Sequence, residues 1–216
     1  KQLLPFAALS ASDFAHIGFF NPYLPLWLKD LGFGLFAISV LTSVQSATRL
    51  FAPYGWGWLS DHTGERVRLL RLGATAALLV SVGLWFDMGS VALFVVLLLM
   101  FANTSGMMPM SEAALAHLVS HGGAFDAKRY GRIRLWGSVG FIVAVLWGGA
   151  LLDYLPIGDV PAMVFALLIG ILVMAFKLPE ERRQAAISRD LPVTEDTPLA
   201  TLGSIVRERQ VWMVMS

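Results

Sequence analysis

The sequence contains no cysteine among its 216 residues. That absence excludes disulfide bonds and any metal site built on thiolate ligands. Charge is also scarce, because Asp, Glu, Lys and Arg make up 14% of the chain, against about 25% in soluble domains. Hydrophobic residues make up 56%. The deficit of charge and the excess of apolar residues predict an integral membrane protein.

Motifs of soluble enzymes are missing as well. The sequence has no glycine-rich phosphate loop, no H-E-x-x-H zinc motif and no nucleophile elbow. Glu112 and His117 are five residues apart and fall on different faces of a helix, so they do not predict a shared metal ion. The net charge is +1, which gives no sign of a nucleic-acid partner. We expect neither an enzyme, nor a metal, nor an organic cofactor.

Six apolar runs are each long enough to cross a bilayer, which takes about 20 residues. They cover residues 3–28, 35–59, 69–86, 91–117, 133–152 and 161–177. The sequence therefore predicts an all-α, six-helix transmembrane bundle over residues 1–177. The charged segment 178–210 is predicted as a cytoplasmic linker with a short amphipathic helix, and 211–216 as the start of a seventh span. This organisation predicts one half of a twelve-span protein.

The basic residues predict the orientation of these spans. All Lys and Arg residues except Lys29 and Arg49 lie at the N-terminus or after the second, fourth and sixth runs. Loops rich in Lys and Arg stay in the cytoplasm. We therefore expect a multi-pass protein of the bacterial inner (plasma) membrane with a cytoplasmic N-terminus.

Prolines and glycines interrupt the first and fourth runs, at 21-NPYLP-25 and 105-SGMMP-109. Such residues are tolerated in spans where a neighbour or a cavity satisfies the freed backbone groups. Two inverted three-span repeats place broken helices at matching positions. The sequence thus predicts a 3+3 inverted repeat with breaks in its first and fourth helices.

Two further patterns predict packing rather than chemistry. Small residues spaced four apart, which let helices approach closely, occur at Gly140, Ala144 and Gly148. Four tryptophans near span ends predict interfacial belts rather than a ligand cage: Trp27, Trp56, Trp58 and Trp85.

The stretch 57-GWLSDHTGERVR-68 follows the second run. Its acid can cap a helix or pair with an arginine, and its second glycine permits a tight turn with positive φ. The spacing closely resembles the loop 2–3 signature of the major facilitator superfamily, although Arg or Lys often follows the acid there. The resemblance implies a cytoplasmic latch between outward-open and inward-open states, formed by Gly57, Asp61, Gly64, Arg66 and Arg68. A generic basic turn is the alternative.

Three other stretches, 109-PMSEA-113, 130-YGRIRLWGSVG-140 and 21-NPYLPLWLKDLG-32, resemble the lactose-permease-like branch of that superfamily. They look nearest to its phenylpropionate-permease-like and nucleoside symporter relatives. In lactose permease the matching acid and arginine of spans 4 and 5 bind the sugar, which implies that Glu112 and Arg134 bind the substrate. A charge inside the membrane costs about 3 kcal/mol or more unless it is paired or meets water. Snorkelling of both side chains to the interface is the alternative.

Other polar residues within the runs are candidates for the same site. Asp13 and His16 share a helix face, and Asp13 and Arg49 are candidates for a buried pair that lines the cavity. Asp13 or Glu112 is a candidate carrier of the coupling proton, and His16 titrates near the same pH range. Asn103 can donate to a substrate. Purely structural ion pairs and helix–helix hydrogen bonds are the alternatives.

Together these features predict a secondary transporter that works by alternating access. We expect proton-coupled symport of a small organic solute of the aromatic acid, nucleoside or sugar class. The substrate would bind at mid-membrane between this bundle and a C-terminal six-helix bundle of the same protein, which is expected to be a monomer in the lipid bilayer. Three alternatives stay open: an uncoupled facilitator, a self-contained six-span half-transporter that dimerises, and a membrane enzyme or scaffold.

Overall fold

The computed structural model describes residues 4–86, 89–121, 124–125 and 127–178. All of them belong to one compact unit within residues 1–182. Apart from Leu178, the predicted linker, its amphipathic helix and the start of a seventh span lie outside the described residues.

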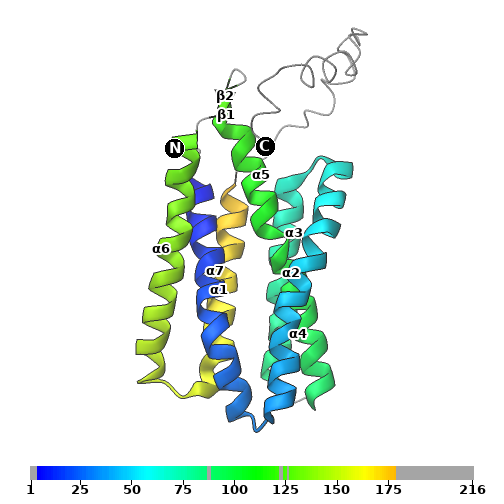
Figure 1. Cartoon of the computed structure of the whole chain (residues 1–216), viewed down its shortest axis with the longest axis vertical. Coiled ribbons are helices and arrows are strands. Elements are labelled where there is room, and N and C mark those ends of the chain that lie inside the picture. Colours follow the sequence, from blue (N-terminus) through cyan, green and yellow to red (C-terminus); the bar gives the residue numbers. More distant parts are fainter. Residues whose placement is uncertain (1–3, 87–88, 122–123, 126, 179–216) are drawn as a thin grey trace, which may run out of the picture. The chain divides into compact units, whose positions relative to one another are not determined.

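The described chain forms six membrane-length helical segments (Figure 1). The first three are α1 (Leu4–Asp30), α2 (Leu35–Thr63), and α3 (Arg66–Ser81) with the 3-10 turn η1 (Val82–Trp85). The last three are α4 (Gly89–Ser105) with α5 (Met107–Val119), then α6 (Ala127–Leu152), then the turn η2 (Ile157–Asp159) with α7 (Val160–Lys177). The six predicted spans are therefore confirmed. A short antiparallel pair, β1 (Ser120–His121) and β2 (Ala124–Phe125), precedes α6 and was not predicted.

Five of the six segments are long and apolar enough to cross a membrane by length and composition alone. The exception is α1, which has 27 residues but carries Asp13, His16, Pro22 and Pro25. This helix can hold Asp13 and His16 because residues of α2, α4, α5 and α6 surround them, so that these side chains contact protein rather than lipid.

The helices pack in a reciprocal pattern. The first segment packs on α6 and α7, whereas α4 of the fourth segment packs on α2 and α3, and α3 also contacts α7. Figure 1 shows α1, α6 and α7 on one side and α2, α3 and α4 on the other. Exchanging the first three segments for the last three reproduces the same contacts, as an inverted repeat requires. The predicted 3+3 repeat is thus confirmed.

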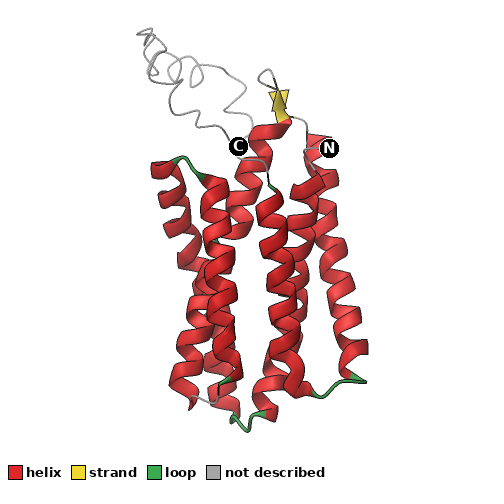
Figure 2. Ribbon diagram, turned by 180° about the vertical axis from the view of Figure 1, so that it is seen from behind, coloured by secondary structure: helices red, strands yellow, loops and turns green. Residues whose placement is uncertain are grey.

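Four segments of the chain lie at one end of the bundle, which we call the basic end. Figures 1 and 2 place there the start of α1, the α2–α3 turn, the β1–β2 pair and the end of α7. The described basic residues at this end are Arg66, Arg68, Arg71, Lys128, Arg132 and Lys177. The basic residues after the second, fourth and sixth spans therefore lie at the same end of the bundle, as the positions of Lys and Arg in the sequence predict.

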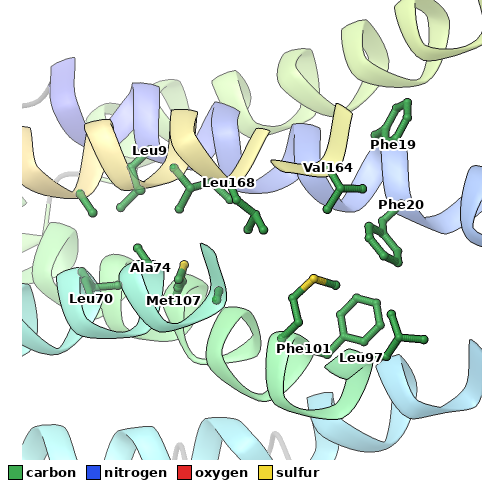
Figure 3. Packing of buried hydrophobic residues seen from close by; sticks show 14 of the residues in the cluster. Leu9, Phe19, Phe20, Leu70, Ala74, Leu97, Phe101, Met107, Val164 and Leu168 are labelled. Carbon is green, nitrogen blue, oxygen red and sulfur yellow. The ribbon is translucent and has the colours of Figure 1, made fainter. Parts of the chain in front are cut away.

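The apolar core lies between the two groups of helices. Leu9, Phe20, Val164 and Leu168 of α1 and α7 face side chains of α3, α4 and α5 (Figure 3). The rings of Phe20 and Phe101 meet edge to face with centroids 5.1 Å apart. Close packing of this kind holds helices together in a bilayer, where lipid tails are as apolar as the side chains.

Glycines let α1 and α6 approach closely. A Cβ on Gly140 would overlap the carbonyl oxygen of Ala11, and a Cβ on Gly148 would lie 2.7 Å from ring carbons of Phe19 and Tyr23. The Tyr23 hydroxyl also donates to the Val145 carbonyl at 2.8 Å. The predicted close approach at Gly140 and Gly148 is confirmed.

The fourth segment is broken at Gly106, between α4 and α5, as the sequence predicts. The Trp56 indole fills this break, where a Cβ on Gly106 would overlap it, and Trp56 Nε1 donates to the Ala102 carbonyl at 2.8 Å. The predicted break in the first run is wrong, because α1 is continuous through both of its prolines. The predicted tryptophan belt is also wrong for Trp56 and for Trp27, which is only 3% exposed.

Arg71 of α3 holds the end of α7. Its guanidinium donates to the carbonyls of Ala175 at 3.3 Å, Phe176 at 3.4 Å and Leu178 at 3.1 Å. It also lies 5.4 Å from the centroid of the Phe176 ring. The last carbonyls of a helix lack partners within it, so Arg71 caps α7 from a neighbouring helix.

Candidate functional site

Asp13 lines two pockets in the bundle. The first, which we call the acid–arginine pocket, is lined by residues of α1, α5 and α6: Ser10, Asp13, Phe14, Ser111, Glu112, Tyr130, Arg134 and four apolar neighbours. The second, which we call the His16 pocket, is lined by residues of α1, α2 and α4: Asp13, His16, Ile17, Gln45, Arg49, Phe101, Thr104 and Ser105. Because Asp13 belongs to both walls, the two pockets adjoin.

Glu112 and Arg134 form an ion pair in the acid–arginine pocket. Arg134 Nη1 on α6 donates to Glu112 Oε1 on α5. The guanidinium also lies 5.7 Å from the centroid of the Phe14 ring, within the range of a cation–π contact. The structure therefore brings the predicted pair together at the wall of a pocket. The two side chains do not extend separately to the membrane interface. The role of the pair in binding a substrate stays a prediction.

Asp13 is buried between the two pockets, with 5% of its surface exposed. Within the part of the chain that the structure describes, it makes no hydrogen bond or ion pair, although it interacts electrostatically with Arg49 and Glu112. Arg49 is exposed. The two residues therefore share a pocket, but the predicted buried pair is not formed.

His16 is 1% exposed, and neither ring nitrogen has a hydrogen-bond partner among the described residues. Its ring packs 5.5 Å from that of Phe20. A buried polar group without a partner costs about 1–3 kcal/mol. The His16 pocket therefore contains a donor and an acceptor that the described bundle leaves unused.

Asn103 lies outside both pockets. Its side-chain amide donates to the Leu99 carbonyl one turn earlier on the same helix, at 2.8 Å. The structure does not bring Asn103 to the other candidates, so its predicted contact with a substrate receives no support from its position.

Several lining residues escaped the sequence reasoning. Thr104 and Ser105 stand directly before the break at Gly106, and Tyr130 lies one turn before Arg134. Their hydroxyl groups are common in helices and follow no spacing of their own. Proximity to a helix break and to an intramembrane charge was the available signal.

The loop signature forms the turn between α2 and α3. Gly64 has φ +65° and donates its N–H to the Ser60 carbonyl, which ends α2 and confirms the predicted tight turn. Asp61 pairs with Arg66 at 3.9 Å, and Arg68 pairs with Glu65 at 2.8 Å. Of the two roles open to Asp61, pairing is the one observed.

Gly57 differs from Gly140 and Gly148 of α6, which pack against α1. A Cβ on Gly57 would meet no atom of the described chain within 4 Å. Any close packing at Gly57 would therefore need a neighbour outside the described residues.

Within the described ranges, no group of three or more His, Asp or Glu side chains offers a metal site.

Comparison with known proteins places this geometry in context. Residues 13–215 match the family described as “MFS_1 like family”. The chain is 35% identical over 145 residues to the maltose permease of Geobacillus stearothermophilus, covering 66% of this chain and 35% of the permease. It is 26% identical over 164 residues to the probable 3-phenylpropionic acid transporter of Escherichia coli (strain K12), covering 74% of this chain and 42% of that protein. It thus spans less than half the length of both relatives.

A solved structure shares the fold. The crystal structure of the nucleoside transporter NupG matches 100% of this chain with a TM-score of 0.76 and 18% sequence identity, and the match covers 53% of the NupG chain. At this identity the similarity shows a common architecture.

Proposed function

Because the chain belongs to the MFS_1 like family, as its resemblance to the major facilitator superfamily predicts, we propose that it is the N-terminal bundle of a secondary transporter. The transporter would move a small organic solute across a membrane by alternating access. The named relatives are a permease and two transporters rather than enzymes, and what they carry suggests a sugar, aromatic acid or nucleoside as the solute class here.

The observation that carries this proposal is the grouping of charges at two adjoining pockets. Glu112, Arg134, Asp13 and Arg49 come from four different helical segments and line these pockets. Charges within spans are unfavourable unless they serve a pathway or are paired. Their convergence on one place supports a solute site rather than four independent structural roles.

The coupling proton is the finer part of the proposal. Asp13 is the favoured carrier because it is buried without a hydrogen bond or ion pair to any described residue. Glu112 is second, since Arg134 already holds it. An uncoupled facilitator would use the same pockets with both acids unchanged through the cycle.

The proposal also covers the orientation of the bundle in the membrane, its gate and its partner bundle. The basic end would lie in the cytoplasm of a bacterial cell, with the Asp61–Arg66 turn acting in the gate. A C-terminal bundle of the same chain would close the open side of the pockets, and the full-length protein would act as a monomer.

The test uses the full-length protein in proteoliposomes with an external pH electrode. The probes are 3-phenylpropionate, uridine and maltose, offered to the native protein and to Glu112→Gln. We expect alkalinisation with one probe, reduced at least about 10-fold in the variant because a charged hydrogen bond is lost.

Each other outcome has a meaning. Uptake without a pH change would leave an uncoupled facilitator. Unchanged uptake and coupling in Glu112→Gln would overturn the role of the acid–arginine pocket. No flux of any probe through the native protein would count against this set of solutes and against transport itself.

A further inference from the structure

The two pockets differ in whether their arginine already forms an ion pair with another residue of the protein. In the acid–arginine pocket, Arg134 is paired with Glu112 and lies beside the Phe14 ring. In the His16 pocket, Arg49 makes no ion pair within 4.0 Å and no hydrogen bond to the residues that the structure describes. Arg49 is therefore the cation available to a ligand, and it stands on the open side of its pocket.

The neighbours of Arg49 suit an anionic group. The buried His16 ring has both nitrogens unpartnered in the same pocket, and Gln45 adds an amide one helical turn from Arg49. Guanidinium, imidazole N–H and amide N–H all donate hydrogen bonds, and a guanidinium fork matches the two oxygens of a carboxylate. Phe101 and Ile17 supply apolar wall beside these donors.

One acid, Asp13, also lines this pocket, and it decides the charge balance. The charged or titratable residues that line its two pockets are His16 of α1, Arg49 of α2, Glu112 of α5, and Tyr130 and Arg134 of α6. Two carboxylates at one site do not readily ionise together. A ligand carboxylate at Arg49 is therefore compatible with Asp13 when a proton occupies Asp13.

We propose that the transported solute is an organic monocarboxylate whose carboxylate binds Arg49 and His16, and whose uncharged end extends past Asp13 to the Glu112–Arg134 pair. This inference rests on the proposed transport function and narrows its solute class to anions. It assigns the His16 pocket to the charged end of the solute and the acid–arginine pocket to the neutral end.

The test compares acids with their uncharged amides. Full-length protein in proteoliposomes is offered 3-phenylpropionate, benzoate and hexanoate, each beside the corresponding amide, with maltose and uridine as neutral probes. The variants are Arg49→Gln and Arg49→Lys, and Lys29→Gln removes a cation from the last turn of α1, outside both pockets, as the matched control. Thermal unfolding of each variant checks that it is folded.

We expect at least one carboxylate to be taken up about 10- to 100-fold faster than its amide. Arg49→Gln should remove that preference by slowing only the carboxylate, Arg49→Lys should restore part of it, and Lys29→Gln should retain it. Equal slowing of acid and amide by Arg49→Gln would make Arg49 a structural residue and overturn the inference.

The remaining outcomes separate the inference from the function on which it rests. Uptake of maltose, uridine or an amide in preference to every acid would overturn the anion site and leave a transporter. If no probe moves in the native protein, both proposals fail together.

Discussion

Charged side chains are scarce in this bundle, and the neighbours of each one determine what it can bind. Arg134 is occupied by Glu112 and Phe14, whereas Arg49 and His16 keep unused donors. Residues of similar chemistry thus have different capacities for a ligand. The difference comes from their surroundings rather than from their type.

His16 offers a test at the scale of the residue. His16→Leu should stabilise the protein by about 1–3 kcal/mol, because leucine has no buried nitrogens that lack partners. Thermal unfolding in detergent should therefore show a higher midpoint, while solute uptake in proteoliposomes should fall.

His62→Leu is the matched control. His62 is exposed, and its Nδ1 contacts the Trp58 carbonyl of its own helix at 3.0 Å, so the stability change should stay within about 0.5 kcal/mol. A lower midpoint for His16→Leu would mean that the imidazole has a partner that stabilises the fold.

At the scale of the helix, close approach depends on glycines that face a neighbouring backbone. Gly140→Ala should destabilise the protein by about 1–3 kcal/mol, because the new methyl group would overlap the Ala11 carbonyl and push α1 from α6. The measurement is the midpoint of thermal or denaturant unfolding.

Gly131→Ala provides the comparison on the same helix. A Cβ there would meet no described atom within 4 Å, and alanine is the better helix former by about 1 kcal/mol. We therefore expect no loss of stability at Gly131. Similar losses at both positions would show that the contact with Ala11 is not the cause.

Arg71 connects two helices across the repeat. Arg71→Gln should cost about 2 kcal/mol, because three carbonyls at the end of α7 lose a charged donor. Hydrogen exchange should rise in the last turn of α7 before it rises elsewhere.

Arg68→Gln is its control, since the exposed pair of Arg68 with Glu65 contributes about 0.5 kcal/mol or less. Equal protection of the α7 end in the native protein and in Arg71→Gln would exclude the capping role.

Local sequence patterns predict where the helices lie in the chain better than they predict the contacts between helices. Hydropathy located all six spans, and the small residues Gly140 and Gly148 predicted a close helix pair because spacing along one helix is a local property. The filling of the Gly106 break by Trp56, the capping of α7 by Arg71 and the exposure of Arg49 were missed. Each of these depends on a neighbour far along the chain, which periodicity does not encode.

At the scale of the whole molecule, the resemblance supplied what periodicity lacked. Glu112 and Arg134 lie on successive helical segments, and only the family pattern pointed to the two as partners. The reciprocal packing places the site where α1 meets the fourth segment, because α1 also packs on α6 and α4 also packs on α2. Residues on these two segments reach both pockets.

The same packing has a consequence for biosynthesis. The helix α1 is synthesised before the other described helices, and its main partner α6 follows about a hundred residues later. At about 5–20 residues per second, that interval lasts about 5–20 s. During that interval α1, which is not apolar enough to span a membrane by composition alone, carries Asp13 without α6, which later lines the acid–arginine pocket beside it. We therefore expect the nascent α1 to depend on the insertion machinery to keep Asp13 away from lipid until α6 is made.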